Sequence, residues 1–174
     1  PPIWNSCPID ALGALGAVGH MRGEFWPKHR SMYNVKQIAC AAHTYGQTIV
    51  DAESFTSWRH WRDGPYYLKL LADQAFIDGL NHITFHTAPH GGGETGVPGL
   101  AYHAGTPIGP NLVWWPMAGP FIEYLSRCSF LLQEGRPVAD VCFYQGDGAP
   151  AFHPLAVDWD PELRHAGYDY DVVD

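Results

Sequence analysis

The sequence has 174 residues, which is enough for one ordinary domain with a hydrophobic core. Its formal charge is −8, from 10 basic and 18 acidic residues, and without any basic cluster this balance argues against a nucleic-acid partner. There is no signal peptide and no apolar run long enough to cross a bilayer, so we expect no membrane partner.

The predicted elements alternate between strands and helices along the chain. In order, they are a strand near 17–22, a helix over 33–45, a strand over 48–53, a helix over 65–80, a strand over 82–86, a helix over about 114–134 and a strand over 138–144. This β-α-β-α-β-α-β order predicts an α/β fold with a parallel sheet and right-handed crossovers. We expect the acidic segments 158–162 and 169–174 to be solvated.

The loops that follow the strands are long and polar, whereas the loops that precede them are short. This asymmetry is typical of barrel enzymes, which build their sites from the loops after the strands. Four strands cannot close a (β/α)8 barrel, which takes about 250 residues, so the pattern indicates a portion of such a barrel. A flavodoxin-like open parallel sheet is the alternative, although the chain lacks a glycine-rich phosphate loop after an early strand.

Three carboxylates come at or near the ends of predicted strands. Glu53 ends the buried run that starts at Thr48, so it is the first candidate for a catalytic carboxylate; the alternative is that it caps the next helix or faces water. Asp51 points the same way one layer deeper and is a further candidate for substrate binding; the alternatives are that it orients neighbours or is a hydrogen-bonded core acid. Glu24 follows the first strand and is a candidate contact for a substrate hydroxyl, or a structural carboxylate.

Histidines and tryptophans surround the same predicted rim. His86 and His90 follow a strand, and His103 lies in the same loop, so these side chains suit hydrogen bonding to a sugar; a metal site is the alternative, although the spacing is not HExxH. Trp58 follows the strand that carries Glu53 and is a candidate for stacking on a pyranose, or it fills the interface between helix and barrel.

Nine short stretches, in this order, resemble glycoside hydrolase family 106, the α-L-rhamnosidases and their relatives. They are RGEFW at 22–26, AAHTYG at 41–46, VDAESFT at 50–56, ADQAFIDGLN at 72–81, FHTAPH at 85–90, WW at 114–115, LLQEG at 131–135, VADV at 138–141 and YDYD at 168–171. Each is weak alone, and together they cover nearly the whole chain.

The resemblance implies a large multidomain enzyme with a (β/α)8 catalytic barrel. Residues 1–136 would be the last part of the barrel and residues 137–174 the start of a following α/β domain. Glu24, Glu53 and His86 would follow barrel strands six, seven and eight. The resemblance implies an inverting mechanism with Glu53 as the general base, while the proton donor after strand four would lie outside this chain.

Several further expectations follow from this resemblance. The substrate would be a glycan containing α-L-rhamnoside, this fragment alone would be inactive, and calcium is a possible cofactor although no calcium loop is legible. Neither end looks like a natural terminus, and a secreted or periplasmic location is plausible for the full-length protein. Half a barrel would expose sheet edges, so we expect self-association or dependence on the missing parts of the chain.

Two alternatives stay open at this point. One is a metal-dependent barrel enzyme that uses His86, His90 and His103 together with Asp51 or Glu53. The other is a non-catalytic fragment that binds carbohydrate or acts as a scaffold.

Overall fold

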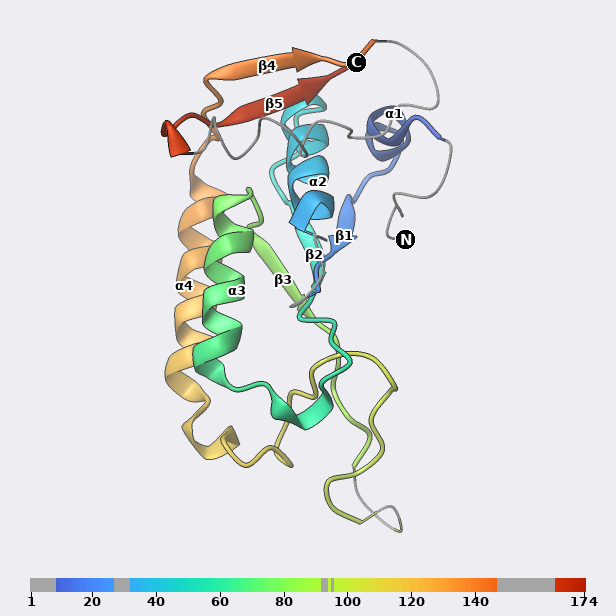
Figure 1. Ribbon diagram of the computed structural model, residues 1–174, viewed down its shortest axis with the longest axis vertical. Coiled ribbons are helices and arrows are strands. Elements are labelled where there is room, and N and C mark those ends of the chain that lie inside the picture. The colour runs from blue at the N-terminus through green and yellow to red at the C-terminus, as the bar shows by residue number, and fades with distance from the viewer. Residues whose placement is uncertain (1–8, 27–31, 92–93, 95, 147–164) are drawn as a thin grey trace.

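The structure is a computed structural model that describes residues 9–26, 32–91, 94, 96–146 and 165–174. Its elements are α1 (Ala11–Gly16), β1 (Arg22–Glu24), α2 (Met32–Thr44), β2 (Asp51–Ser54), the 3-10 helix η1 (His60–Arg62), α3 (Pro65–Ile77), β3 (His82–Phe85), the 3-10 helix η3 (Trp115–Met117), α4 (Gly119–Glu134), β4 (Val141–Tyr144) and β5 (Tyr170–Val173). Helices and parallel strands alternate along most of the chain, so the predicted α/β class is confirmed (Figure 1). No described helix is both long enough and apolar enough to span a membrane.

The main sheet contains β1, β2 and β3 in chain order, and all pairs are parallel. Arg22 lies opposite Asp51, and Asp51 lies opposite His82. Each strand therefore pairs with the next strand along the chain across one helical crossover, which is the arrangement expected for a portion of a (β/α)8 barrel.

One face of this sheet packs tightly against helices. Gly23 and its neighbour Ala52 lie on this face, and a Cβ added to Gly23 would come within 1.8 Å of the Ile38 Cδ1 atom of α2. Gly79, which follows α3, has φ +101°, and a Cβ there would lie 2.6 Å from the Ala39 Cβ atom. Glycine at these two positions lets α2 approach the sheet and lets the end of α3 approach α2.

The opposite face of the sheet is polar. Because side chains alternate along a strand, Arg22, Asp51 and His82 form one row on this face, and Glu24, Glu53 and Thr84 form the next. The side chains of Arg22 and His82 remain 40% and 48% exposed. Polar chemistry is thus collected on the face turned away from α2.

A second, two-stranded parallel sheet of β4 and β5 packs against α2 (Figure 1). Tyr170 and Val172 of β5 are fully buried. The Lys36 Nζ atom lies 2.7 Å from the Asp169 carboxylate, and the His43 Nδ1 atom lies 2.8 Å from the Asp171 carboxylate. After α4 the chain leaves the main sheet and enters the second sheet at β4 (Val141–Tyr144). The domain boundary expected between residues 136 and 137 stays a prediction.

Four features differ from the sequence expectations. The first strand begins at Arg22, later than expected, because residues 17–20 form turns and bends. They follow the unforeseen helix α1, whose cap Asp10 accepts a hydrogen bond from the Gly13 backbone N–H.

The helix expected from 114 begins as η3 and becomes α4 only at Gly119, because prolines at 116 and 120 interrupt the backbone hydrogen bonding. The strands expected from 48 and from 138 each begin three residues later than expected, at Asp51 and Val141. Residues 170–173 form a partly buried strand rather than a solvated segment, whereas residues 158–162 lie outside the described residues.

Candidate active site

The carboxyl ends of the three main strands bring two carboxylates and one imidazole together. Glu24 and Glu53 are register partners on β1 and β2, and His86 follows β3 directly. Parallel strands end at the same edge of a sheet, so side chains separated by about thirty residues in sequence meet at one rim. The predicted placement of these three side chains at one rim agrees with the structure.

Glu53 is held on one side and accessible on the other. Its Oε1 atom accepts a hydrogen bond from the Thr56 hydroxyl at 3.1 Å and lies 3.1 Å from the His86 Nδ1 atom. The Thr56 hydroxyl also lies 3.2 Å from that nitrogen, which closes a triangle of polar atoms. Because the Glu53 side chain is still 33% exposed, this carboxylate is oriented but can reach a bound molecule.

The turn after β2 depends on an unusual backbone at Phe55. Its φ is +65°, a left-handed conformation that costs a bulky L-residue about 1–2 kcal/mol. The Phe55 ring is fully buried between Phe25, at 5.1 Å between centroids, and Phe85, at 5.8 Å. This packing maintains the turn that returns Thr56 to the Glu53 carboxylate three residues earlier.

Glu24 lies deeper in the site than Glu53. It is 4% exposed, and its Oε1 atom accepts a hydrogen bond of 3.1 Å from the Trp26 indole N–H. Burial raises the pKa of Glu24, and the negative charge of Glu53 adds to this rise, while the Trp26 hydrogen bond and the His86 imidazole oppose it. Glu24 therefore takes up a proton more readily than an ordinary glutamate.

Asp51 lies below this rim and supports it. Its carboxylate is fully buried and contacts Arg22 at 2.5 Å, His82 at 2.9 Å, His20 at 3.0 Å and Thr84 at 3.0 Å. Burial alone would raise the pKa of Asp51, but hydrogen bonds from His82, His20, Arg22 and Thr84 together outweigh it and lower that pKa. These contacts give Asp51 a supporting role, which is one of the roles expected for it, while a substrate contact by Asp51 stays a prediction.

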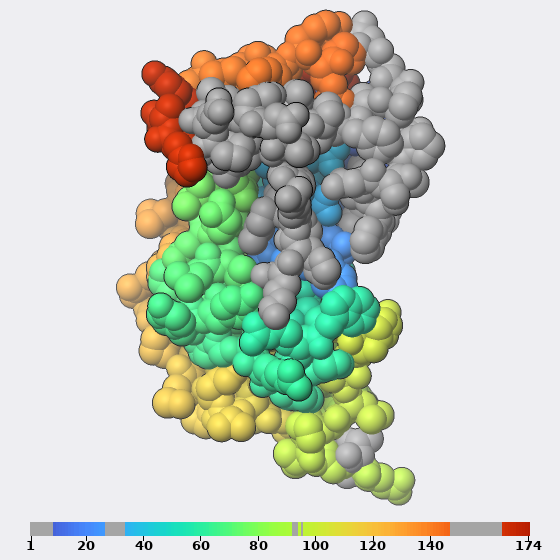
Figure 2. Space-filling view, in the orientation of Figure 1, coloured from blue at the N-terminus to red at the C-terminus, as the bar shows by residue number. Residues whose placement is uncertain are grey.

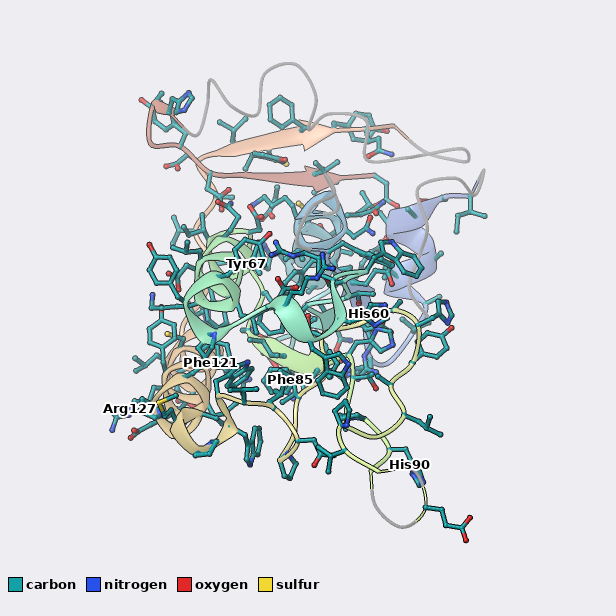
Figure 3. All side chains as sticks on the ribbon, turned by 60° about the horizontal axis from the view of Figure 1, so that its bottom comes forward. His60, Tyr67, Phe85, His90, Phe121 and Arg127 are labelled. Atoms are coloured by element: carbon teal, nitrogen blue, oxygen red, sulfur yellow. The ribbon has the colours of Figure 1, made fainter. Side chains whose placement is uncertain are left out.

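The other predicted site residues lie on the loops that follow the strands. Trp58 follows β2 and is 55% exposed. The centroid of its ring lies 5.1 Å from that of Trp26, and the Trp26 indole N–H donates to the Glu24 carboxylate. His90 lies on the projecting loop after β3 (Figure 3), where its backbone pairs with Leu100. A substrate contact by His90 stays a prediction without support from neighbouring groups.

Three residues around the rim were not singled out from the sequence. Thr56 and Trp26 hold the two carboxylates, and Tyr102 contacts the His86 ring at 5.6 Å. For two of them the sequence holds a local signal, because Thr56 follows Glu53 by three residues and Trp26 follows Glu24 by two. Tyr102 carried no such local signal, because the long loop after β3 decides where it lies.

The described residues do not form a metal site by themselves. In the part of the chain that the structure describes, no three side chains of histidine, cysteine, aspartate or glutamate are grouped to hold a metal ion. His86, His90 and His103 therefore do not form the site that the metal-dependent alternative requires. For calcium, which takes six to eight oxygen ligands, the rim offers two carboxylates with one oxygen each already hydrogen-bonded, so these residues alone do not fit that ion.

Comparison with known proteins places this geometry in a family. The family model for α-L-rhamnosidase, glycoside hydrolase family 106, matches residues 8–174. A protein of Formosa agariphila named "Putative beta-glucuronidase" is 35% identical over 175 residues, which cover 99% of this chain and 14% of that protein. The solved structure of a rhamnosidase from Novosphingobium sp. PP1Y is similar with a TM-score of 0.73 and 32% identity, covering 87% of this chain and 15% of that one.

The chain thus spans about one seventh of the length of these relatives. The similarity to the rhamnosidase structure supports the assignment of the α/β elements to part of a rhamnosidase fold. Because the family model covers nearly the whole sequence, the chain belongs to glycoside hydrolase family 106, the α-L-rhamnosidase family.

Proposed function

We propose that this chain is the last part of the catalytic barrel of an inverting α-L-rhamnosidase, with Glu53 as the general base. Residues 1–136 would complete the barrel, and residues 137–174 would begin the next α/β domain. The observation that carries this proposal is the Glu53 carboxylate, which is oriented by Thr56 and His86 and remains accessible at the carboxyl ends of parallel strands.

The geometry suits the activation of a water molecule. An inverting glycosidase needs one carboxylate that takes a proton from water and a separate acid that protonates the leaving oxygen, with about 6.5–9.5 Å between the two groups. Glu53 fits the first role because its Oε1 atom is fixed by Thr56 while the side chain is partly open. The proton donor would come from a part of the full-length enzyme outside this chain.

Glu24 would serve the same site as a substrate contact. Its carboxylate, which the Trp26 indole N–H holds in place, would accept a hydrogen bond from a sugar hydroxyl. His86 would help by holding Glu53 and by offering its remaining ring nitrogen to the sugar.

The character of the rim favours a neutral sugar over a uronic acid. A glucuronide carries a carboxylate, which would meet the two acids Glu24 and Glu53. Among the described residues, no arginine or lysine side chain contacts either acid to offset that repulsion. Rhamnose carries a methyl group in place of the carboxylate, so we propose rhamnosides rather than the glucuronides suggested by the name of the Formosa relative.

The test is an assay of the full-length enzyme with two chromogenic substrates. We expect release of nitrophenol from nitrophenyl α-L-rhamnoside and at least about a hundredfold slower release from nitrophenyl β-D-glucuronide, because an unpaired charge is strongly rejected by a polar site. Proton NMR during the reaction should show the β anomer of rhamnose as the first product, as an inverting mechanism requires. Faster cleavage of the glucuronide, or first release of the α anomer, would contradict the proposal.

The burial of Glu24 predicts a second result, in stability rather than activity. A carboxyl whose pKa is raised on folding stabilises the fold below its ordinary value of 4.5, and this contribution is lost as the pH rises through the folded value. Glu24→Gln in the full-length enzyme should therefore raise the unfolding temperature of the barrel at pH 7 and have little effect below pH 4.5.

The matched control for this measurement is Glu123→Gln. Glu123 lies on α4 with a 59% exposed side chain and pairs with Arg127, so its replacement should raise the unfolding temperature at neither pH. Scanning calorimetry of both variants at pH 7 and pH 4 would check the sign. A destabilised Glu24→Gln variant at pH 7 would show that the ionised form of Glu24 is needed by the fold.

A further inference from the structure

Four aromatic side chains form a continuous surface beside the two carboxylates. Trp26 contacts Trp58 at 5.1 Å between ring centroids, Trp58 stacks on His103 at 5.6 Å and 22°, and His103 contacts Tyr102 at 4.0 Å. We call Trp26, Trp58, His103 and Tyr102 the aromatic wall. The loop after β2 supplies Trp58, and the loop after β3 supplies Tyr102 and His103; the space-filling view shows these two loops side by side (Figure 2).

Both ends of the aromatic wall are connected to the acids of the candidate site. At one end, the Trp26 indole N–H donates to the Glu24 carboxylate. At the other end, Tyr102 packs on the His86 ring at 5.6 Å, and His86 lies beside Glu53. The aromatic wall therefore runs beside the site from one carboxylate to the other.

The aromatic wall presents much of its surface to solvent. Trp58 is 55% exposed and Tyr102 is 57% exposed, although each could have buried its ring in a core. Within the described residues, no hydrogen bond occupies the Trp58 indole N–H, the Tyr102 hydroxyl or the ring nitrogens of His103. The surface thus combines apolar ring faces with donors and acceptors at their edges.

That combination fits a pyranose ring. A pyranose has an apolar face of C–H groups and a perimeter of hydroxyls, so it stacks on an aromatic face while its hydroxyls bond to polar edges. A nucleobase also stacks on aromatic rings, but the formal charge of −8 disfavours a nucleic acid. Isolated exposed rings occur elsewhere on this chain, such as Tyr66 on α3, but the aromatic wall is contiguous and borders the carboxylates.

We propose that the aromatic wall binds a second sugar ring of an oligosaccharide, next to the rhamnose that is cleaved at Glu53. The assignment rests on the proposed function for the identity of the first ring. The wall itself can be tested by binding alone, without turnover. Trp58 and Tyr102 would then determine the preference for an oligosaccharide over a simple rhamnoside.

The experiment measures binding by calorimetry to the full-length enzyme carrying Glu53→Gln. The probes are rhamnose, a disaccharide with rhamnose at the non-reducing end and a disaccharide with rhamnose at the reducing end. Adding Trp58→Ala or Tyr102→Ala should weaken the binding of at least one disaccharide about tenfold, as expected for the loss of a stacked ring, and change rhamnose binding less than about twofold. The disaccharide that responds tells on which side of the rhamnose the second ring lies.

Two further variants serve as controls for a general loss of folding. Trp58→Phe keeps an aromatic face and should retain disaccharide affinity within about threefold. Tyr66→Ala removes a ring of α3 that is 81% exposed and does not belong to the aromatic wall, so it should change nothing. Unchanged binding of both disaccharides in Trp58→Ala and Tyr102→Ala, or an equal loss for rhamnose and disaccharides, would overturn the proposal.

The same data separate this proposal from the proposed function. If the Glu53→Gln enzyme still turns over rhamnosides, the assignment of the base fails, whereas a selective loss of disaccharide affinity in Trp58→Ala still supports the aromatic wall. If Glu53→Gln is inactive but the wall variants bind both disaccharides normally, only the wall proposal fails.

Discussion

Replacing Glu53 with glutamine in the full-length enzyme should reduce kcat on nitrophenyl α-L-rhamnoside by about 10²- to 10⁴-fold, the usual contribution of a general base. The amide keeps the size of the side chain and can still accept from the Thr56 hydroxyl, so the rim should keep its shape. It cannot accept a proton from water, so the chemical step should slow while substrate binding changes little. Steady-state kinetics would therefore show the loss in kcat rather than in KM.

The control for this result is Glu123→Gln, because Glu123 is an exposed carboxylate of α4 that pairs with Arg127. That variant should keep the activity of the unaltered enzyme, and both variants should unfold at similar temperatures. Near-normal turnover by Glu53→Gln would remove Glu53 from the mechanism. A large fall in unfolding temperature would instead show that the charge of Glu53 holds the rim together.

Replacing Asp51 with asparagine should destabilise the barrel by about 3 kcal/mol, because removing one partner of a buried ion pair leaves uncompensated charge and unpaired donors. The Asp51 carboxylate is fully buried and has four hydrogen-bonding neighbours. An amide carries no charge to offset the Arg22 guanidinium. Because Arg22 and His82 are partly exposed, the expected cost lies at the lower end of the range for buried pairs.

Hydrogen exchange of the β1–β3 backbone amides, followed by mass spectrometry, would measure this loss locally in a large enzyme. The matched control is Asp73→Asn on α3, whose carboxylate is 31% exposed and pairs with Lys69, so its loss should cost no more than about 1 kcal/mol. Equal protection in Asp51→Asn and the unaltered enzyme would rule out the supporting role assigned to Asp51.

The pH dependence of this effect has a definite sign. The folded-state pKa of Asp51 is lowered below its ordinary value of 3.8, because hydrogen bonds from His82, His20, Arg22 and Thr84 outweigh burial. Such a carboxylate gives its full stabilisation above pH 3.8 and loses it as the pH falls through the folded-state value. The difference between the Asp51→Asn and unaltered enzymes should therefore be constant near neutral pH and shrink below about pH 3.8.

The rim of the site could be predicted because local sequence determines it. A buried run that turns acidic at its end predicts both the direction of the strand and the side on which Glu53 emerges. Parallel pairing then brings Glu24 and His86 to the same edge. Thr56 belongs to the same local pattern, but its contact with Glu53 depends on the left-handed backbone of Phe55, which no residue preference predicts.

The parts that could not be predicted depend on distant partners. Asp169 directly precedes strand β5 and Asp171 lies on it, and acids in such a short segment suggest a solvated tail. In the structure these acids pair with Lys36 and His43, which are 133 and 128 positions away. The aromatic wall likewise depends on how the loop after β3 returns toward Trp58, which side-chain periodicity does not encode.

The attachment of β5 to α2 has a consequence for the order in which the chain folds. The Lys36 side chain is 3% exposed, and its ammonium lies both beside Asp169 and over the Tyr170 ring at 4.8 Å. A ribosome makes α2 more than a hundred residues before these partners, so this surface of the helix stays uncovered until β5 has been made. Contacts over such sequence separations form late and slow folding, so the emergence of β5 limits when the packing around α2 can be completed.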